Sequence, residues 1–327
     1  EVDALFETIN RLKADGLSVI FISHKLNEVT QITDRVTVLR DGKLIGTVNT
    51  CDMNQGTLAA MMVGREAFGV KRQAELTSGK KALLKINGLC ANNDQGFPTL
   101  KDITLDVHEG EILGVAGVGG NGQKELAETL CGVRECTKGS IQLEGQELIG
   151  KAPAAITKAG VGRIPEDRHE GMVGDLTVTE NLALEYLTEY TQNGILDRKA
   201  IHHNAEKLIE QFQIKARPND PIRTLSGGNM QKVLLARVLS RNPKAVIVPQ
   251  PTRGLDVGAT DYVRSQLLEQ RKRGAAVLMI SEDLDEILAL SDRIAVIYEG
   301  EIVGVLPAAE ATPERLGLLM SGAVKEN

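Results

Sequence analysis

The sequence predicts an α/β protein with a parallel sheet and a phosphate-binding loop, and three observations lead to this class. Short, mainly apolar runs at 111–116, 245–248 and 276–280 have the length and hydrophobicity of strands buried on both faces of a sheet. The first run leads directly into the glycine loop Gly117–Gly122 and then a helix, the order of a phosphate-binding unit. At 225–232 a polar turn with two adjacent glycines opens into another buried helix, and free amides at a helix start attract anions.

Composition narrows the classes of function. The 327 residues are 42% hydrophobic and 25% charged, as in an ordinary globular protein. A net charge of −6, with 3% aromatic residues and no tryptophan, argues against a nucleic-acid partner. No apolar run approaches the roughly 20 residues of a membrane span, and the first residues lack the pattern of a signal peptide. We expect reduced thiols and no metal site, because no Cys-x-x-Cys pair occurs among Cys51, Cys90, Cys131 and Cys136.

The chain contains an internal repeat. Residues 16–48 align without a gap to residues 274–306, at an offset of 258, with 11 identical pairs. Such a long period indicates a duplicated domain, because solenoid units repeat every 20–50 residues or so. We expect 1–64 to be the C-terminal remnant of a first copy, 65–82 a linker and 83–327 the second copy. The first copy's phosphate loop is then expected upstream of residue 1, as in an N-terminally truncated tandem protein.

In the first copy the predicted elements follow the apolar pattern. Residues 1–13 form an amphipathic helix, and the apolar run 19–22 reads as a buried parallel strand. Ser23 and His24 come at the carboxyl end of that strand, where open α/β sheets place ligands. A helix over 26–32 and a hairpin pairing 35–39 with 44–48 around Asp41-Gly42 complete this part.

In the second copy, amphipathic strands from Leu83 precede the strand 111–116, the glycine loop and a helix over 125–130. Residues 172–224 read as mostly helical, with a capping box formed by Thr177 and Glu180. The glycine turn and its helix, the strand 245–248, a helix to Arg273 and the strand 276–280 follow.

Ser-Gly-Gly alone is common in turns, but with its neighbours it resembles the signature motif of ATP-binding cassette (ABC) ATPases. The resemblance implies a P-loop NTPase nucleotide-binding domain with a mixed sheet core, an antiparallel β subdomain and a helical subdomain. In that family the signature acts across a dimer, on ATP held by the other nucleotide domain. The residues that carry the resemblance, before Lys232, are Leu225, Ser226, Gly227, Gly228, Asn229 and Gln231.

The second copy departs from the family pattern at catalytic positions. The lysine and hydroxyl residue that follow the loop in the family are here Gln123 and Lys124, so the cation is displaced and the Mg²⁺-binding hydroxyl is missing. The acidic pair that ends the Walker B strand is replaced by Pro249-Gln250, which offers no general base. At the switch position Glu282 would repel a γ-phosphate, whereas His24 in the first copy can hydrogen-bond it.

These departures predict that the two copies have different roles. We expect ATP and Mg²⁺ to be bound, and ATP to be hydrolysed, by the first copy's loop and His24, with the signature supplied by the second copy. The second copy's own pocket is expected to cleave ATP poorly, so that this chain alone is not competent for hydrolysis. An alternative is that Lys124 and Glu125 restore activity in a shifted register. The expected pocket residues are Gly117, Gly119, Gly120, Asn121, Gly122, Gln123, Lys124 and Glu125.

Three further positions have weaker signals. Phe97 precedes the loop by 20 residues and either stacks on adenine, as the family's A-loop aromatic does, or is a core residue. Glu166 stands where the family has a glutamine that reaches the metal and the membrane partner. Asp256 lies in a stretch that resembles the family's D-loop.

The motifs resemble most closely the tandem ATP-binding subunits of bacterial importers for simple sugars and nucleosides. That resemblance implies membrane permease subunits, an extracytoplasmic binding lipoprotein, a partner N-terminal nucleotide-binding domain and a peripheral place on the cytoplasmic side of the membrane. Two alternatives remain open: a ribose- or galactose-type sugar importer ATPase, and a non-hydrolytic nucleotide-binding scaffold or regulator. A cassette protein acting on ribosomes or DNA is disfavoured, because the predicted linker is too short.

Overall fold

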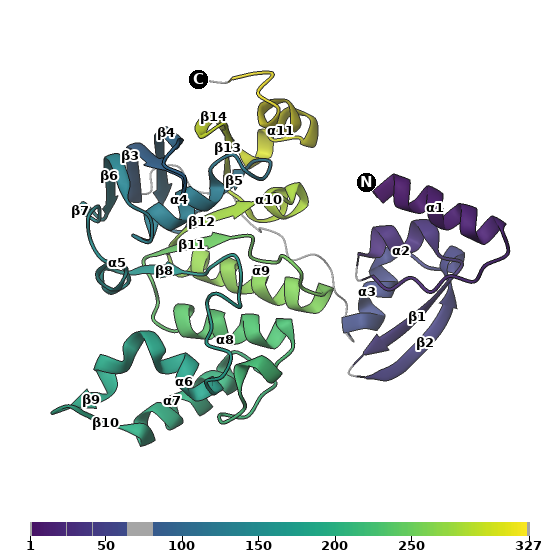
Figure 1. The fold of residues 1–327 in the computed structure, drawn as a ribbon, viewed down its shortest axis with the longest axis horizontal. Coiled ribbons are helices and arrows are strands. Elements are labelled where there is room, and N and C mark those ends of the chain that lie inside the picture. Colours follow the sequence, from purple (N-terminus) through teal and green to yellow (C-terminus); the bar gives the residue numbers. More distant parts are fainter. Residues whose placement is uncertain (1, 24, 41, 64–80, 326–327) are drawn as a thin grey trace. The chain divides into compact units, whose positions relative to one another are not determined.

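The computed structural model describes residues 2–23, 25–40, 42–63 and 81–325 (Figure 1). The chain divides into two units, one formed by 1–69 with 255–262 and the other by 70–254 with 263–327. The predicted linker lies almost wholly outside the described residues, and the predicted domain boundaries stay a prediction.

The core of the second unit is a six-stranded sheet in the order β14-β13-β5-β12-β11-β8. All neighbours are parallel except β14, which pairs antiparallel with β13, so the sheet is mixed as predicted. The three apolar runs of the sequence are the adjacent strands β5, β12 and β11, and each is fully buried. The strands are β5 (Ile112–Ala116), β8 (Val161–Arg163), β11 (Ala245–Pro249), β12 (Ala276–Ser281), β13 (Arg293–Tyr298) and β14 (Glu301–Pro307).

A second, antiparallel sheet has the order β4-β3-β6-β7. Helix α4 (Gln123–Leu130) contacts this sheet and also β11, so it lies between the two sheets with its apolar face buried on both sides. Alternating apolar residues of the antiparallel strands and the inner residues of α4 form one continuous core. The strands are β3 (Ala82–Asn92), β4 (Pro98–His108), β6 (Cys136–Leu143) and β7 (Gln146–Glu147), and α5 (Pro153–Ala159) leads into β8.

A helical group follows β8, drawn in green in Figure 1. It is formed by α6 (Val178–Ala183), α7 (Arg198–Gln211) and α8 (Gly227–Leu239), which contact one another. The predicted capping box is confirmed at the start of α6. The prediction of mostly helix over 172–224 is only partly right, because the small hairpin β9 (Thr191–Gln192) and β10 (Ile195–Leu196) interrupts it. Short 3₁₀ turns η2 (Leu184–Tyr190) and η3 (Ile222–Thr224) also belong to this group.

The first unit repeats the order of the chain's C-terminal elements. Its elements are α1 (Val2–Ala14), α2 (Leu26–Ile32), β1 (Arg35–Arg40), β2 (Lys43–Asn49), η1 (Thr50–Asp52) and α3 (Gln55–Val63). At the offset of 258 these match the C-terminal part of α9 (Val257–Lys272), then α10 (Leu284–Leu290), β13, β14, η4 (Ala308–Glu310) and α11 (Pro313–Met320). Even the register shift in the hairpin recurs, at Val38/Leu39 and at Val296/Ile297. The predicted helices and hairpin of the first unit are confirmed.

One prediction for the first unit is wrong. The run 19–22 forms no strand, and the side chains of Ile20 and Ile22 are each 91% exposed. The matching strand β12 is buried because β5 and β11 pair with it on both sides. No strand among the described residues pairs with 19–22, and an apolar run without such neighbours has no sheet to enter.

No helix within the described part of the chain is long and apolar enough to cross a membrane.

Candidate functional site

The glycine loop connects β5 to the first turn of α4, as the sequence predicts. Gly120 and Gly122 have φ angles of +89° and +103°, which favour glycine. A Cβ on Gly122 would lie 3.0 Å from the Leu100 side chain and 3.3 Å from the Thr99 carbonyl oxygen. The tight curve of the loop therefore depends on glycine at this place.

The Gln123 side chain folds back into this loop and fills it. Its Nε2 donates to the Val118 carbonyl oxygen at 2.7 Å, and its Oε1 accepts from the Asn121 N–H at 3.0 Å. The side chain is 9% exposed. One backbone donor that a phosphate would need is thus already used, and the position of the usual lysine carries no charge.

Asn121 holds the loop against the β13–β14 turn. Its Nδ2 donates to the Val118 carbonyl oxygen at 2.8 Å, and its Oδ1 accepts from the Glu299 N–H at 2.7 Å. The Gly300 N–H donates to the Asn121 carbonyl oxygen at 3.1 Å. These bonds, together with those of Gln123, fix the loop in one shape.

Glu282 and Gln250 complete the wall of the loop. A Cβ on Gly119 would lie 2.9 Å from Glu282 Oε1, so this carboxylate lies over the loop. The Glu282 N–H donates to Gln250 Oε1 at 3.4 Å, and the Gln250 N–H donates to the Ile280 carbonyl oxygen at 2.7 Å. Gln250 has a φ of +46°, an uncommon conformation for a residue other than glycine. The structure thus brings together three of the four predicted degenerate positions, Gln123, Gln250 and Glu282, and Pro249 directly precedes Gln250 at the end of β11.

The residues of this glycine loop and its wall do not fit a bound nucleoside triphosphate with Mg²⁺. The Gln123 side chain inside the loop is a neutral amide, and Pro249 has no side-chain atom that could bind a metal ion. Glu282 adds negative charge where phosphates would lie. Within the described residues no cluster of three or more His, Cys, Asp or Glu side chains could hold a metal ion.

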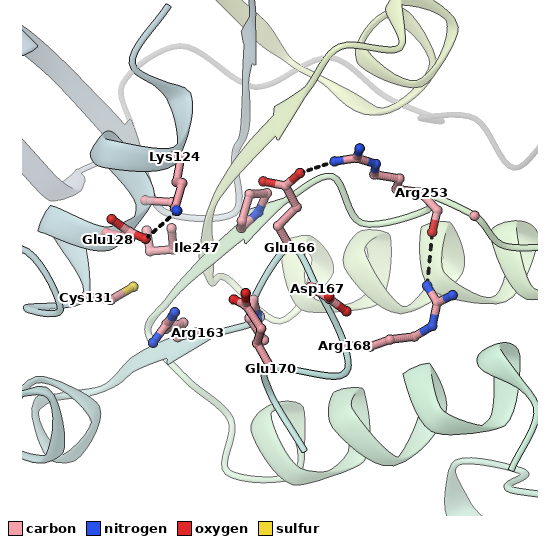
Figure 2. A pocket seen from close by; sticks show the side chains of 14 residues that line it. Lys124, Glu128, Cys131, Arg163, Glu166, Asp167, Arg168, Glu170, Ile247 and Arg253 are labelled. Carbon is pink, nitrogen blue, oxygen red and sulfur yellow. Dashed lines mark hydrogen bonds and ion pairs between the residues drawn. The ribbon is translucent and has the colours of Figure 1, made fainter. Parts of the chain in front are cut away.

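Lys124 does not lie with Gln123 in the loop. Its ammonium group is 3.8 Å from Glu128 Oε1 and lines a separate cavity on the side of β8 and β11 (Figure 2). Glu125, in the first turn of α4, is half-buried. This arrangement provides no support for the shifted register.

Phe97 occupies the turn between β3 and β4, and its side chain is 67% exposed. The alternative of a core residue is therefore wrong, whereas stacking on adenine stays a prediction. The residues after it reach the loop region, because the Lys101 N–H donates to the Gly300 carbonyl oxygen at 2.8 Å.

The signature residues begin α8. Ser226 is the N-cap residue, and its Oγ accepts from the N–H and the Nδ2 of Asn229 at 3.4 and 3.1 Å. Gly227 and Gly228 are the first helical residues, where N–H groups have no partner inside the helix. The buried Gln231 donates to the Pro251 carbonyl oxygen at 3.5 Å. Leu225 directly precedes this turn. The turn presents backbone amides and a hydroxyl that can bind an anion, and it belongs to a different element from the glycine loop.

Two further predicted residues lie elsewhere. Asp256 Oδ1 accepts from the Ala259 N–H at 2.8 Å and so caps the first turn of α9. His24 lies outside the described residues. Its neighbour Ser23 donates to Glu28 Oε2 at 2.9 Å, as Ser281 donates to Glu286 Oε2 at 2.8 Å in the second copy.

Glu166 lines the cavity of about 560 Å³ that Lys124 also reaches (Figure 2). It forms an ion pair with Arg253, and the Arg168 Nη1 donates to the Arg253 carbonyl oxygen at 3.2 Å. Burial raises the pKa of the Cys131 thiol in the cavity wall to about 12, so this thiol is protonated and unreactive. Arg168 and Arg253 were not among the predicted site residues, although both follow the carboxyl ends of parallel strands, which was the available signal.

Comparison with known proteins shows that residues 100–253 match the family described as ABC transporter. The glucose import ATP-binding protein TsgD13 of Haloferax volcanii is 43% identical over 98% of this chain and 60% of its own length. The guanosine import ATP-binding protein NupO of Bacillus subtilis is 42% identical over 100% of this chain and 64% of its length. The nucleoside import ATP-binding protein NupA of Lactococcus lactis is 42% identical, over 98% and 64%. The chain thus spans less than two thirds of these relatives.

Solved structures share the fold. The ADP conformation of an ATP-binding cassette of an ABC transporter has a TM-score of 0.61 and 22% identity, and covers 74% of this chain and 95% of its own. A dimeric cassette in a post-hydrolysis state with ADP and Pi has a TM-score of 0.60 and 21% identity, over 69% of this chain and 98% of its own. The mixed sheet, the antiparallel sheet and the helical group therefore have the fold of these ATP-binding cassettes.

Proposed function

We propose that this chain, which matches the ABC transporter family over residues 100–253 and has the fold of an ATP-binding cassette, is the energy-coupling subunit of an importer for nucleosides or simple sugars. Relatives at 42–43% identity carry names for glucose, guanosine and nucleoside import, which supports this class of solute. Permease subunits at the membrane, an extracytoplasmic binding lipoprotein and a place on the cytoplasmic face belong to the same proposal.

One observation carries the mechanistic part of the proposal. The domain's own glycine loop is filled by Gln123 and faced by the Glu282 carboxylate, whereas the amides of Gly227 and Gly228 at the start of α8 remain available. A domain whose glycine loop is occupied by its own side chain, but whose anion-binding turn is intact, is best suited to contact a nucleotide that another domain binds.

The partner in this proposal is a second nucleotide-binding domain that holds ATP and Mg²⁺, in the same polypeptide or another. The repeat at an offset of 258, with the same hairpin shift in both copies, supports a tandem arrangement. His24 is then the switch residue of that first domain, at the place of Glu282. Bound ATP supplies the driving force for closure, and Ser226, Gly227 and Gly228 orient and neutralise its terminal phosphate.

The test is a matched set of variants in the transporter reconstituted with its permease and its partner nucleotide-binding domain. Ser226→Arg blocks the signature turn and should lower permease-stimulated ATP hydrolysis by about 100-fold or more, the typical cost of losing anion-stabilising donors. His24→Ala should have a loss of the same order. Gln250→Ala, in the degenerate pocket, should stay within about 2-fold of wild type, because no transition-state contact is removed.

The opposite pattern would overturn the proposal: activity that survives Ser226→Arg but is lost in Gln250→Ala means that the nucleotide is cleaved beside the glycine loop. Binding of ATP by the wild-type assembly without any hydrolysis would favour the non-hydrolytic scaffold instead.

A further inference from the structure

Arg168 lies where the signature turn meets the loop after β11. A Cβ on Gly227 would be 3.2 Å from Arg168 Nη2 and 3.3 Å from its Nε, and a Cβ on Gly254 would be 3.7 Å from Nη2. The Nη1 donates to the Arg253 carbonyl oxygen at 3.2 Å (Figure 2). One guanidinium group therefore contacts two segments that are about 27 residues apart in sequence.

The position of this cation is electrostatically unfavourable in the protein alone. A positive charge beside a helix N-terminus interacts unfavourably with the helix dipole. The Nε is buried and has no hydrogen-bond partner among the described residues, which adds a desolvation cost. A negative group that binds at the signature turn offsets the unfavourable interaction between the Arg168 charge and the helix dipole, because it interacts favourably with both the backbone amides and the guanidinium.

The neighbouring residues extend this connection. Glu166, two residues before Arg168, forms an ion pair with the Arg253 side chain. On the other side of Arg168, the Gly171 carbonyl oxygen accepts from Nη2 of Arg237 at 2.6 Å, and Arg237 is a buried residue of α8. The segment 166–171 is thus bonded both to the loop after β11 and to the second half of the signature helix.

We propose that Arg168 is a positioning residue that holds the signature turn in register with the 253–254 loop, so that the Gly227 and Gly228 amides meet a terminal phosphate together. The inference rests on the proposed function, since it concerns the same signature surface. It adds a residue that acts through the backbone of Gly227 and Arg253 without needing to touch the nucleotide.

The experiment compares Arg168→Met, Arg168→Lys and Arg163→Met in the reconstituted assembly. Methionine keeps much of the packing volume but removes the charge and the donors, and it should lower kcat by about 10-fold while KM for ATP changes by less than about 2-fold. Lysine keeps the charge and one donor to the Arg253 carbonyl oxygen and should return kcat to within about 3-fold of wild type. Arg163 is exposed in the same cavity, and its variant should behave as wild type.

Thermal unfolding midpoints of the variants check that each one is folded. A merely structural role predicts that methionine is tolerated at least as well as lysine, and that result would overturn the proposal. Equal losses in the Arg163 and Arg168 variants would do so too, since cavity charge alone would explain them. If Arg168→Met does not fold, Arg168→Gln, which also removes the charge, takes its place in the same comparison with Arg168→Lys, and a glutamine variant as active as the lysine variant would overturn the proposal.

Ser226→Arg in the same assay separates the two proposals. Loss of activity in Ser226→Arg with wild-type behaviour of Arg168→Met contradicts only the positioning role, whereas activity that survives Ser226→Arg contradicts the signature function on which it rests.

Discussion

Glu286 is a buried carboxyl group, 1% exposed, that joins three segments around the degenerate pocket. Its Oε1 accepts from Thr252 Oγ1 and its Oε2 from Ser281 Oγ, each at 2.8 Å, and Arg264 Nε lies 3.8 Å from Oε1. Burial is the main cause that raises the pKa of this carboxyl group, against the opposing effect of its hydrogen bonds. Its ionised form is therefore less stable in the folded state than in the unfolded chain.

The pH dependence of stability follows from the sign of this shift. As pH rises above the ordinary pKa of a glutamate, the unfolded chain loses the proton first, so Glu286 lowers the free energy of unfolding until its own pKa is passed. Glu286→Gln keeps a neutral hydrogen-bonding group and should unfold at a higher temperature than wild type at pH 7, with the gain vanishing below about pH 4. Melting curves between pH 3.5 and 8, with the exposed Glu210→Gln as control, measure this. A gain that persists at the acidic end would show that the shift is not its cause.

At the scale of the element, the glycine loop has the curve of a phosphate-binding loop, but the Gln123 side chain occupies its interior. Gly120 and Gly122 have the left-handed angles that the curve needs, and the Asn121 side chain ties the loop to the β13–β14 turn. Gln123 supplies from within the loop the hydrogen bonds that a phosphate would otherwise make. The hydrogen bonds of Gln123 thus stabilise the shape of the loop without a bound ligand.

Nucleotide affinity of the isolated chain should rise when this filling is removed. Gln123→Ala frees the Asn121 N–H, and Glu282→Gln removes a negative charge over Gly119, so each should tighten ATP binding by about 3- to 10-fold, or roughly 1 kcal/mol. Calorimetry with ATP and Mg²⁺ measures the change, and the exposed Glu299→Gln in the adjacent turn is the charge-matched control. Unchanged or weaker binding in both variants would mean that the filled loop is not what limits affinity.

At the scale of the whole chain, the same pattern occurs in two environments. The first unit and the C-terminal part of the second unit share their elements, their hairpin shift and the Ser–Glu hydrogen bond after the apolar run. The apolar run differs between them: 19–22 is mostly exposed, whereas β12 is fully buried between two parallel strands. Local sequence is therefore not what separates the two outcomes.

Hydrogen–deuterium exchange should show this difference directly. Amides of 277–280 are bonded within the sheet and should exchange about 1,000-fold or more slowly than those of 19–22, since about 4 kcal/mol of local stability gives that factor. The measurement is peptide-resolved mass spectrometry on the chain, with the β1–β2 hairpin as an internal reference. Equal protection of the two runs would show that 19–22 is paired in solution.

Much of the fold follows from short-range patterns in the sequence. Helices over 2–14 and 26–32, the Asp41-Gly42 hairpin, the strand–loop–helix unit and the capping box at Thr177 were all predicted, because each depends on neighbours close in sequence. The repeat and the signature turn were also readable there. Residue identity alone further predicts that Gln123, Gln250 and Glu282 lack the chemistry for hydrolysis, which stays a prediction, although it does not indicate where their side chains lie.

The tertiary structure decided what depends on neighbours distant in sequence. Whether an apolar run such as 19–22 becomes a strand depends on two partner strands, since backbone N–H and C=O groups in a parallel sheet bond only to other segments. The carboxylate over Gly119 and the place of Arg168 beside Gly227 and Gly254 likewise depend on segments that are distant in sequence. The sequence by itself therefore determined the elements of the fold and the residue types at each position of the site, and only long-range packing determined which groups from distant segments meet, because side-chain direction is set by what surrounds it in space.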